Sequence, residues 1–481
     1  MITLETQPKH GVALRFEPWE RWGLGLAVGF YIAICLMTIG IGSPLGHDEA
    51  LYATRAREFL TGDPAAPWFS SNRAPGLPLL LTLAWVGNGT EPYLRLVVAL
   101  SGVVLIALTW LTARMMINRV AAPIAAFGVA LTPIVIVSAT QVWPDIPGAA
   151  AGMAALFLYG WGLSRPRFQG WNVLLVVACI VMATVIRFGA PLQLGVGFIA
   201  LTLWRWPRDR DRWLKVAGVA VMGAVGVGLI LMTPLVTGHG IPGQTISVGS
   251  ADNPAFSGFG DYWTLRARLA AGPVAVGLLG VAIGLVRSWF DRDMRRLFVW
   301  PFVIAICTFI VISSVVHGES RYLSPFYPWF WIAASVGLAA MGKRMPAVWR
   351  TVLAPAMVVL FVLLAPALSD DAQEFNWGYS TIETAARSLA DSGPCEVLTS
   401  YTPQVEWYSG CETENIDPEV LVVDSPTFPM GPRYLFIVEN GKRQPDEALM
   451  EQYIEETTGE PQAFGPPGAS LRYVEIWTLR R

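Results

Sequence analysis

Residues 22–53 read WGLGLAVGFYIAICLMTIGIGSPLGHDEALYA. Residues 22–42 carry no charged side chain, and about 20 apolar residues in a helix are enough to cross the hydrocarbon core of a bilayer. The adjacent acids Asp48 and Glu49 follow within a few residues. The stretch therefore predicts a membrane-spanning helix that leads directly into an acidic loop.

The composition of the whole chain extends this prediction. Hydrophobic residues make up 53% and charged residues 15% of the chain, whereas soluble proteins are about 25% charged. The shortage of charge is confined to residues 1–368. We expect a polytopic α-helical membrane domain at residues 1–368 and a small soluble α/β domain at residues 369–481. The net charge of −2, without a basic face, argues against nucleic acid as a partner.

Apolar runs of spanning length recur about eleven times in the first domain. The candidate spans are residues 22–42, 92–113, 120–141, 146–163, 171–186, 189–204, 214–236, 265–286, 297–316, 322–341 and 348–368. Several contain Pro or Gly, which is tolerated where neighbouring helices satisfy the freed backbone groups.

The orientation follows from lysine and arginine in short loops, which are enriched on the cytoplasmic side. Alternate connections are basic, and they contain Arg114 and Arg119, Arg165 and Arg167, Arg205 to Lys215, Arg287 to Arg296, and Lys343 to Arg350. We therefore expect the amino terminus and these loops to be cytoplasmic. The loop 43–91 and residues 369–481 are then extracytoplasmic, in a multi-pass protein of the inner or plasma membrane.

The first outer loop is expected to contain two helices. Residues from about 48 to 60 have the spacing of an amphipathic helix on the membrane surface, with Asp48, Tyr52 and Arg55 near one face. Residues 75–87 are apolar but short, and counting them as a span would invert every later loop. We interpret them as an interfacial or re-entrant helix, and a short true span remains the alternative.

Acidic residues stand at two predicted outer boundaries of the membrane. Asp48 and Glu49 follow the first span, and Asp145 lies between Pro144 and Pro147 at the start of a later one. One interpretation is helix capping, because the helix dipole favours acids in the first turn. The other is a functional role, because an acid at the edge of an apolar span is energetically costly unless it has a charged partner or a function. The second interpretation predicts a shared extracytoplasmic cavity.

Basic residues at outer edges suggest an anion site. Arg321 lies in His317-Gly-Glu-Ser-Arg-Tyr322, and Arg187 lies at another outer corner. A guanidinium matches a phosphate group in a fork geometry. A salt bridge of Arg321 with Glu319, or an interfacial arginine that only reaches toward water, is the alternative.

Together these motifs resemble the glycosyltransferase C superfamily, in the branch of protein O-mannosyltransferases and lipid A aminoarabinose transferases. The resemblance rests on HDEALYA at 47–53, RAPGLP at 73–78, Asp145 and RYLSPFYP at 321–328. Arg73-Ala-Pro is a departure, since that branch usually has Lys-Pro-Pro there.

The resemblance implies an inverting transfer of a hexosyl or pentosyl group. The donor would be a polyprenyl-phosphate monosaccharide, and the acceptor an extracytoplasmic glycolipid, polysaccharide or protein. Asp48 would be the acid-base residue. The predicted catalytic residues are Asp48, Glu49 and Asp145, and the predicted substrate-binding residues are His47, Tyr52, Arg55, Arg73, Arg187, His317, Arg321 and Tyr322. No cofactor is required by this resemblance, although His47 and the three acids include ordinary ligands of a divalent metal.

The polar tail has the pattern of a partly parallel sheet covered by helices. We expect helices at 381–389 and 446–457 and strands at 396–400, 433–438 and 472–479. Cys395 and Cys411 are able to form a disulfide if the tail is extracytoplasmic. The tail either holds the acceptor or serves as a lid or stability module.

Two other classes of function fit the composition. A lipid-sugar flippase or transporter would have polar residues near mid-span and related halves, and neither is evident in the sequence. A non-enzymatic membrane assembly protein, in which the acids are structural, would bind a lipid-linked sugar without turnover.

Overall fold

The computed structural model divides into two compact units. The helical unit comprises residues 1–37, 67–80 and 96–368, and the sheet unit comprises residues 38–66, 81–95 and 369–481. The sheet unit takes in two pieces of the first outer loop as well as residues 369–481, and the expected division into two domains stays a prediction. The structure describes residues 17–40, 42–61, 74–165, 168–206, 210–236, 257–264, 272–315, 319–344, 379–416, 431–439, 447–466 and 473–480.

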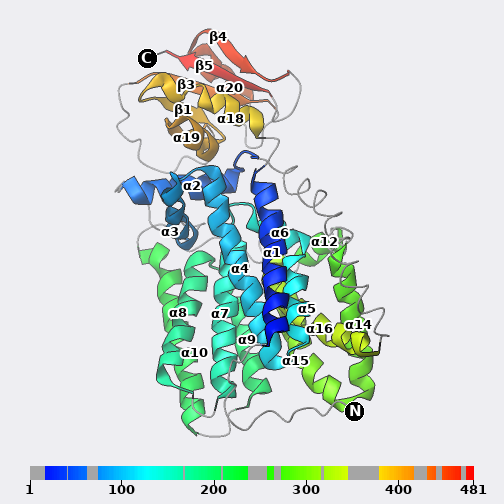
Figure 1. The fold of residues 1–481 in the computed structure, drawn as a ribbon. Helices are drawn as coiled ribbons and strands as arrows, with labels where there is room; N and C mark the ends of the chain where they lie inside the picture. Colours follow the sequence, from blue (N-terminus) through cyan, green and yellow to red (C-terminus); the bar gives the residue numbers. More distant parts are fainter. Residues whose placement is uncertain are drawn as a thin grey trace. The chain divides into compact units, whose positions relative to one another are not determined.

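The helical unit is a bundle in which α7, α8 and α10 run side by side (Figure 1). The last residues of α1 and the first of α4 belong to the sheet unit. The elements are α1 Pro18–Gly40, α3 Gly76–Leu81, α4 Glu91–Met116, α5 Ala121–Ala130, α6 Pro133–Ala139, α7 Asp145–Ser164, α8 Gly170–Ile186, α9 Ala190–Trp204, α10 Arg210–Val236, α12 Ser257–Thr264, α14 Pro273–Phe290, α15 Arg292–Val315, η2 Ser320–Leu323 and α16 Phe326–Arg344.

Within the described residues, six helices are long and apolar enough to cross a membrane, or seven if the bent pair α5 and α6 is one span. Shorter apolar helices lie at Gly76–Gly87, Gly170–Ile186, Ala190–Trp204 and Phe326–Gly342. The predicted polytopic helical class is confirmed. The expected count of about eleven spans stays a prediction, and the candidate at 348–368 lies outside the described residues.

The predicted span 120–141 is broken, because α5 and α6 meet at an angle of 58°. Pro133 begins α6 and has no N–H to continue the ladder of α5. The hydroxyl of Thr132 donates instead to the carbonyl of Gly128, at 2.8 Å, and accepts the indole N–H of Trp331, at 2.8 Å. The kink is therefore stabilised from a neighbouring helix.

Helices α14 and α16 pack so closely that their backbones are in contact. A Cβ atom built on Gly337 would lie 1.9 Å from the carbonyl oxygen of Gly280. Such close contact requires glycine, and small residues at the interface are the usual means of packing helices in lipid.

The sheet unit contains a five-stranded sheet in the order β2-β1-β3-β5-β4. Strand β1 is parallel to β2 and β3, and β5 is antiparallel to β3 and β4. The elements are α2 His47–Thr61, η1 Thr82–Gly87, α18 Ser380–Arg387, η3 Ala390–Ser392, β1 Glu396–Thr399, α19 Thr402–Ser409, β2 Glu412–Glu414, β3 Arg433–Val438, α20 Glu447–Glu455, β4 Thr457–Phe464 and β5 Val474–Leu479. The small α/β domain expected from the sequence is therefore present.

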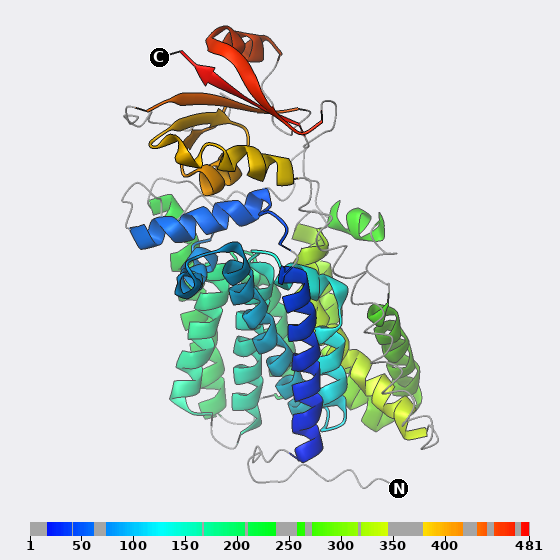
Figure 2. The same cartoon turned by 45° about the horizontal axis from the view of Figure 1, so that its top comes forward.

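Helices cover both faces of the sheet, with α18 and α19 on one side and α20 on the other (Figure 2). Met450 and Tyr453 of α20 pack against a core cluster that includes Leu398 and Leu435. Strand β4 was not expected, because Gly459 and Pro461 in its sequence are typical of turns. Its place at the edge of the sheet explains the exception, since edge strands tolerate such residues.

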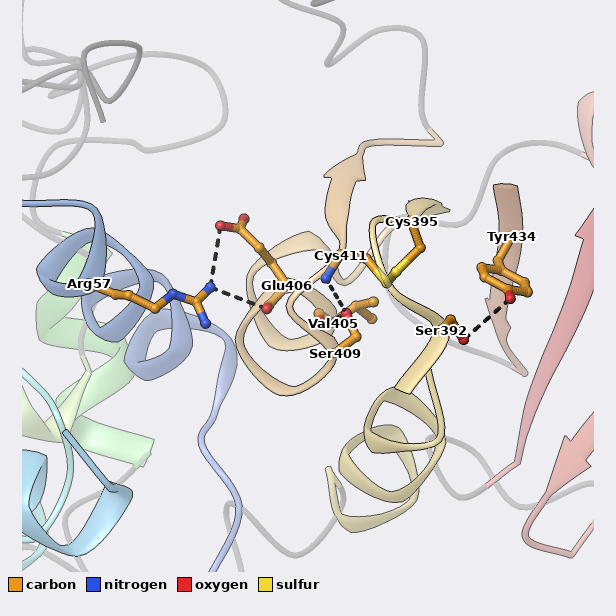
Figure 3. The surroundings of a disulfide bond; sticks show 8 residues. All are labelled: Arg57, Ser392, Cys395, Val405, Glu406, Ser409, Cys411 and Tyr434. Atoms are coloured by element: carbon orange, nitrogen blue, oxygen red, sulfur yellow. Dashed lines mark hydrogen bonds and ion pairs between the residues drawn. A yellow bond between two sulfur atoms is a disulfide. The ribbon is translucent and has the colours of Figure 1, made fainter. Parts of the chain in front are cut away.

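The disulfide ties the starts of β1 and β2 together (Figure 3). Cys395 and Cys411 are bonded, and their Cα atoms are 4.8 Å apart, within the usual range for this link. Helix α19 lies between the two cysteines in the sequence. The bridge therefore holds the loop that presents α19.

Candidate active site

The acidic turn at the start of α2 gives its two carboxylates different surroundings. Glu49 is buried, with 1% of its surface exposed. Its carboxylate accepts the N–H of Gly46 at 2.8 Å and lies 3.6 Å from Nε of Arg95. Arg95 is buried as well, and it donates to the carbonyl of Pro44 at 3.1 Å. Glu49 is thus engaged in capping the helix and neutralising a buried cation.

Asp48 is only half-buried, in contrast to Glu49. The charge of Asp48 acts on the phenol of Tyr379. Burial raises the pKa of Tyr379, and the nearby Tyr401, Asp48 and Glu49 raise it further. Asp48 is therefore part of the charged surroundings of Tyr379 in the polar tail.

Helix α19 holds the residues that precede Asp48. The hydroxyl of Tyr408 accepts the N–H of Leu45 at 2.7 Å. The amide oxygen of Gln404 lies 3.2 Å from Nδ1 of His47. The sequence alone did not single out Gln404 and Tyr408, and their spacing of four residues on one helix face was the only signal for them.

Tyr52 and Arg55 continue along α2 from Asp48. Tyr52 is 6% exposed, so its ring is part of the packing of α2. Arg55 is half-buried, and its charge offsets part of the rise in the pKa of Glu406 on α19 that burial and Glu58 cause. The neighbouring Arg57 donates to the carbonyl of Glu406, at 3.3 Å (Figure 3). Its guanidinium also lies 5.3 Å from the ring centroid of Trp407. The predicted substrate-binding residues Arg73 and His317 lie outside the described residues.

A second cluster forms in the helical unit around Asp145, at the start of α7. Asp145 is 1% exposed and accepts a hydrogen bond from a guanidinium NH of Arg187. Arg187 lies between α8 and α9, and 14% of its side chain is exposed. The predicted acid and the predicted phosphate ligand are therefore paired with each other.

The ring of Tyr322 lies beside two guanidinium groups. Those of Arg187 and Arg321 lie 4.7 and 5.3 Å from its centroid. The guanidinium of Arg321 also lies 4.5 Å from the ring of Trp143. Cation–π contacts of this kind hold guanidinium groups in place without consuming their hydrogen-bond donors.

Glu319 closes this second cluster. It pairs with Nε of Arg321 at 2.5 Å, and its carboxylate accepts the hydroxyl of Tyr322 at 3.2 Å. The hydroxyl of Tyr262 donates to the backbone carbonyl of Glu319 at 3.1 Å. Two acids thus balance two arginines, and each arginine has more donors than its acid uses. We call these residues the arginine cluster: Trp143, Asp145, Arg187, Tyr262, Glu319, Arg321 and Tyr322.

An apolar groove adjoins the arginine cluster. Gly148 lies one helical turn after Asp145, and a Cβ built on it would come 3.4 Å from Cβ of Arg187. The groove runs between α7, α9, α15 and α16. It is lined by Gly148, Ala149, Gly152, Met153, Leu156, Ala190, Gln193, Leu194, Thr308, Pro325, Pro328 and Trp329.

The sequence left a divalent metal on His47 and the acids possible, without requiring one. Among the residues that the structure describes, no three His, Cys, Asp or Glu side chains are grouped as a metal site.

Comparison with solved structures identifies the fold. The crystal structure of ArnT from Cupriavidus metallidurans bound to undecaprenyl phosphate superposes with a TM-score of 0.65, over 95% of this chain and 98% of that one, at 16% identity. The chain has a glycosyltransferase C-type fold. The resemblance to the glycosyltransferase C superfamily is thereby confirmed at the level of the fold.

Other comparisons find further similar proteins. Residues 72–236 match the family of dolichyl-phosphate-mannose-protein mannosyltransferases. The Archaeoglobus fulgidus oligosaccharyltransferase in complex with Zn and sulfate is similar over 93% of this chain and 72% of that one, with a TM-score of 0.58 and 14% identity. The same organism's oligosaccharyltransferase AglB, with an inhibitory peptide and a dolichol-phosphate, gives a TM-score of 0.56 at 13% identity, over 82% of this chain and 64% of that one. A search of curated protein sequences finds no match.

Proposed function

We propose that the protein transfers one hexosyl or pentosyl group from a polyprenyl-phosphate donor to an extracytoplasmic acceptor. The acceptor is a glycolipid, a polysaccharide or a protein. The observation that carries the proposal is the arginine cluster beside an apolar groove in a glycosyltransferase C-type fold. A polyprenyl phosphate has one anionic head and one apolar chain. The arginine cluster matches the anionic head, and the apolar groove matches the chain.

The arginine cluster binds the phosphate of the donor. Arg187 and Arg321 offer charged donors, which are about twice as strong as neutral ones. As the bond between the anomeric carbon and the phosphate oxygen breaks, the leaving phosphate gains negative charge. Fixed cations that face this charge lower the barrier. Asp145 acts in this scheme by holding Arg187 in place.

The prenyl chain of the donor occupies the apolar groove. On α7 this groove is lined by the small residues Gly148, Ala149 and Gly152. The groove adjoins Arg187, so a lipid in it has its phosphate next to that guanidinium.

Asp48 is the general base. It accepts the proton of the acceptor hydroxyl while that oxygen attacks the anomeric carbon, and the phosphate leaves with the electron pair of the broken bond. One displacement inverts the configuration of the sugar. Glu49 is held by Gly46 and Arg95, so it positions the loop that bears Asp48. General-base assistance of this kind contributes roughly 10²–10⁴ to the rate.

The remaining predicted contacts belong to the same proposal. His47, Tyr52, Arg55, Arg73 and His317 contribute to substrate binding, and no resident cofactor or metal is required. The protein is a multi-pass protein of the inner or plasma membrane, with a cytoplasmic amino terminus and an extracytoplasmic tail. The disulfide between Cys395 and Cys411 supports this placement of the tail, because such bonds persist in oxidising compartments.

Turnover of a defined donor tests the proposal. The purified protein is incubated with a panel of synthetic polyprenyl-phosphate sugars and membrane or glycan acceptors, and release of polyprenyl phosphate is measured. We expect release by the wild type and its loss in Asp48→Asn. Tight binding of the donor without any turnover would favour a non-enzymatic assembly protein instead.

A further inference from the structure

Two residues of α19 fix the short segment that ends at Asp48. Gln404 and Tyr408 are one helical turn apart and so share a face of α19. Tyr408 accepts the backbone N–H of Leu45 at 2.7 Å, and Gln404 meets the side chain of His47 at 3.2 Å. The contact with Tyr408 fixes the backbone at Leu45. The contact with Gln404 orients the imidazole of His47, a group that takes part in acid-base chemistry.

Gln404 is an unusual residue for its surroundings. Its exposed fraction is 0%, and the nitrogen of its amide is buried without a hydrogen-bond partner. An unsatisfied buried donor lowers stability. If packing were the only role of this position, an apolar side chain of the same volume would be favoured there. The contact with His47 is the feature that an apolar side chain would lose.

We propose that Gln404 of the tail is a positioning residue that sets the orientation and tautomer of His47 beside the base Asp48. With the amide oxygen of Gln404 facing Nδ1, that nitrogen carries the proton. The Nε2 atom of His47 is then the acceptor nitrogen of the imidazole. This inference rests on the proposed transfer reaction. It gives the tail a role in that reaction, which is to orient His47.

The charge state of His47 is the quantity that Gln404 controls. A neutral amide lets the imidazole stay neutral, whereas a carboxylate at the same position would raise the pKa of His47. Titratable groups that neighbour His47 or Gln404 in the sequence, or that interact with those neighbours, are Asp48 and Glu49 of α2, Arg95 of α4, Tyr379 before α18, Tyr401 before α19, and Glu406 and Tyr408 of α19. All of them are unchanged in a Gln404 variant, so a shift reports on the new carboxylate.

The first test is the pH profile of kcat/KM for Gln404→Glu in the full-length protein. We expect its acid limb to move to higher pH by one unit or more. Transfer at pH 6 then falls about tenfold or more against the wild type, because one pKa unit is a factor of ten in the neutral fraction. At pH 8.5 the activity stays within about threefold. An acid limb that does not move overturns the proposal.

The second test does not depend on a buried carboxylate. Gln404→Leu and His47→Gln are measured alone and together. If Gln404 acts through His47, Gln404→Leu lowers kcat/KM about tenfold in the wild type and by less than twofold in the His47→Gln background. If the double variant loses kcat/KM by the product of the two single losses, the residues act independently and the proposal is refuted.

Controls separate this inference from the proposed function and from simple misfolding. Ser392→Ala removes a hydrogen bond with Tyr434 elsewhere in the tail, at 3.4 Å, and should leave the pH profile unchanged. Thermal unfolding of every variant reports on folding. If the wild type fails to release polyprenyl phosphate, the proposed function fails. If the wild type turns over and the two substitutions act independently, only the role of Gln404 fails.

Discussion

The neighbouring acids Asp48 and Glu49 should respond to substitution in opposite ways. Glu49 and Arg95 have side chains that are 1% and 3% exposed. Removing one partner of a buried ion pair costs about 3–5 kcal/mol, because the other charge is left uncompensated. Asp48 is half-buried at the first turn of α2, where an acid contributes about 0.3–1 kcal/mol through the helix dipole.

We therefore expect Glu49→Gln to lower the free energy of unfolding by about 3–5 kcal/mol. Asp48→Asn should lower it by less than about 1 kcal/mol while reducing the rate of transfer roughly 10²–10⁴-fold. Stability is measured by thermal unfolding in detergent, followed by tryptophan fluorescence. Turnover is measured as release of polyprenyl phosphate under conditions where each variant is folded.

A double substitution supplies the control for this prediction. Glu49→Leu with Arg95→Met replaces the ion pair by apolar side chains, so it should recover most of the stability lost in Glu49→Gln. The reasoning is refuted if Glu49→Gln unfolds like the wild type, or if Asp48→Asn is the more destabilised variant and retains its turnover.

Three further predictions follow from individual contacts. Arg187→Ala should raise the KM for the lipid donor about 10–100-fold, since a charged hydrogen bond is worth about 1.5–3 kcal/mol; unchanged donor kinetics would contradict its role. Replacing Cys395 and Cys411 by Ser opens a loop with a sequence separation of 16, which should destabilise the tail by about 3 kcal/mol in denaturant titrations. Burial, and then the charge of Glu58, raise the pKa of Glu406 from 4.5 to about 7, so the folded state binds this proton more tightly than the unfolded state. The free energy of unfolding should fall as pH rises from 4.5 to 7, and Glu406→Gln should flatten that fall, whereas equal pH slopes would contradict it.

The helices of the bundle were predictable because length and apolar composition determine a span. The break between α5 and α6 was harder to foresee. Pro133 marks a weak point in the sequence, but the bend also depends on Thr132 and on Trp331, which lies 199 residues away. Strand β4 was missed since its turn-like residues are tolerated only at a sheet edge, and the edge is a property of the whole sheet.

The candidate site was foreseen by residue type and only in part by role. Asp145, Arg187, Arg321 and Tyr322 do assemble in one cluster. Their mutual pairing follows from the packing of separate helices and could not be read from spacing. The same holds for Gln404, because its contact with His47 joins residues 357 positions apart.

The most direct test of the central claim is a structure of the protein with a bound polyprenyl phosphate. We predict that the phosphate lies within hydrogen-bond distance of Arg187 and Arg321, with the first isoprene units against α7 in the apolar groove. A lipid phosphate bound away from both arginines, with the groove filled only by side chains, would contradict it.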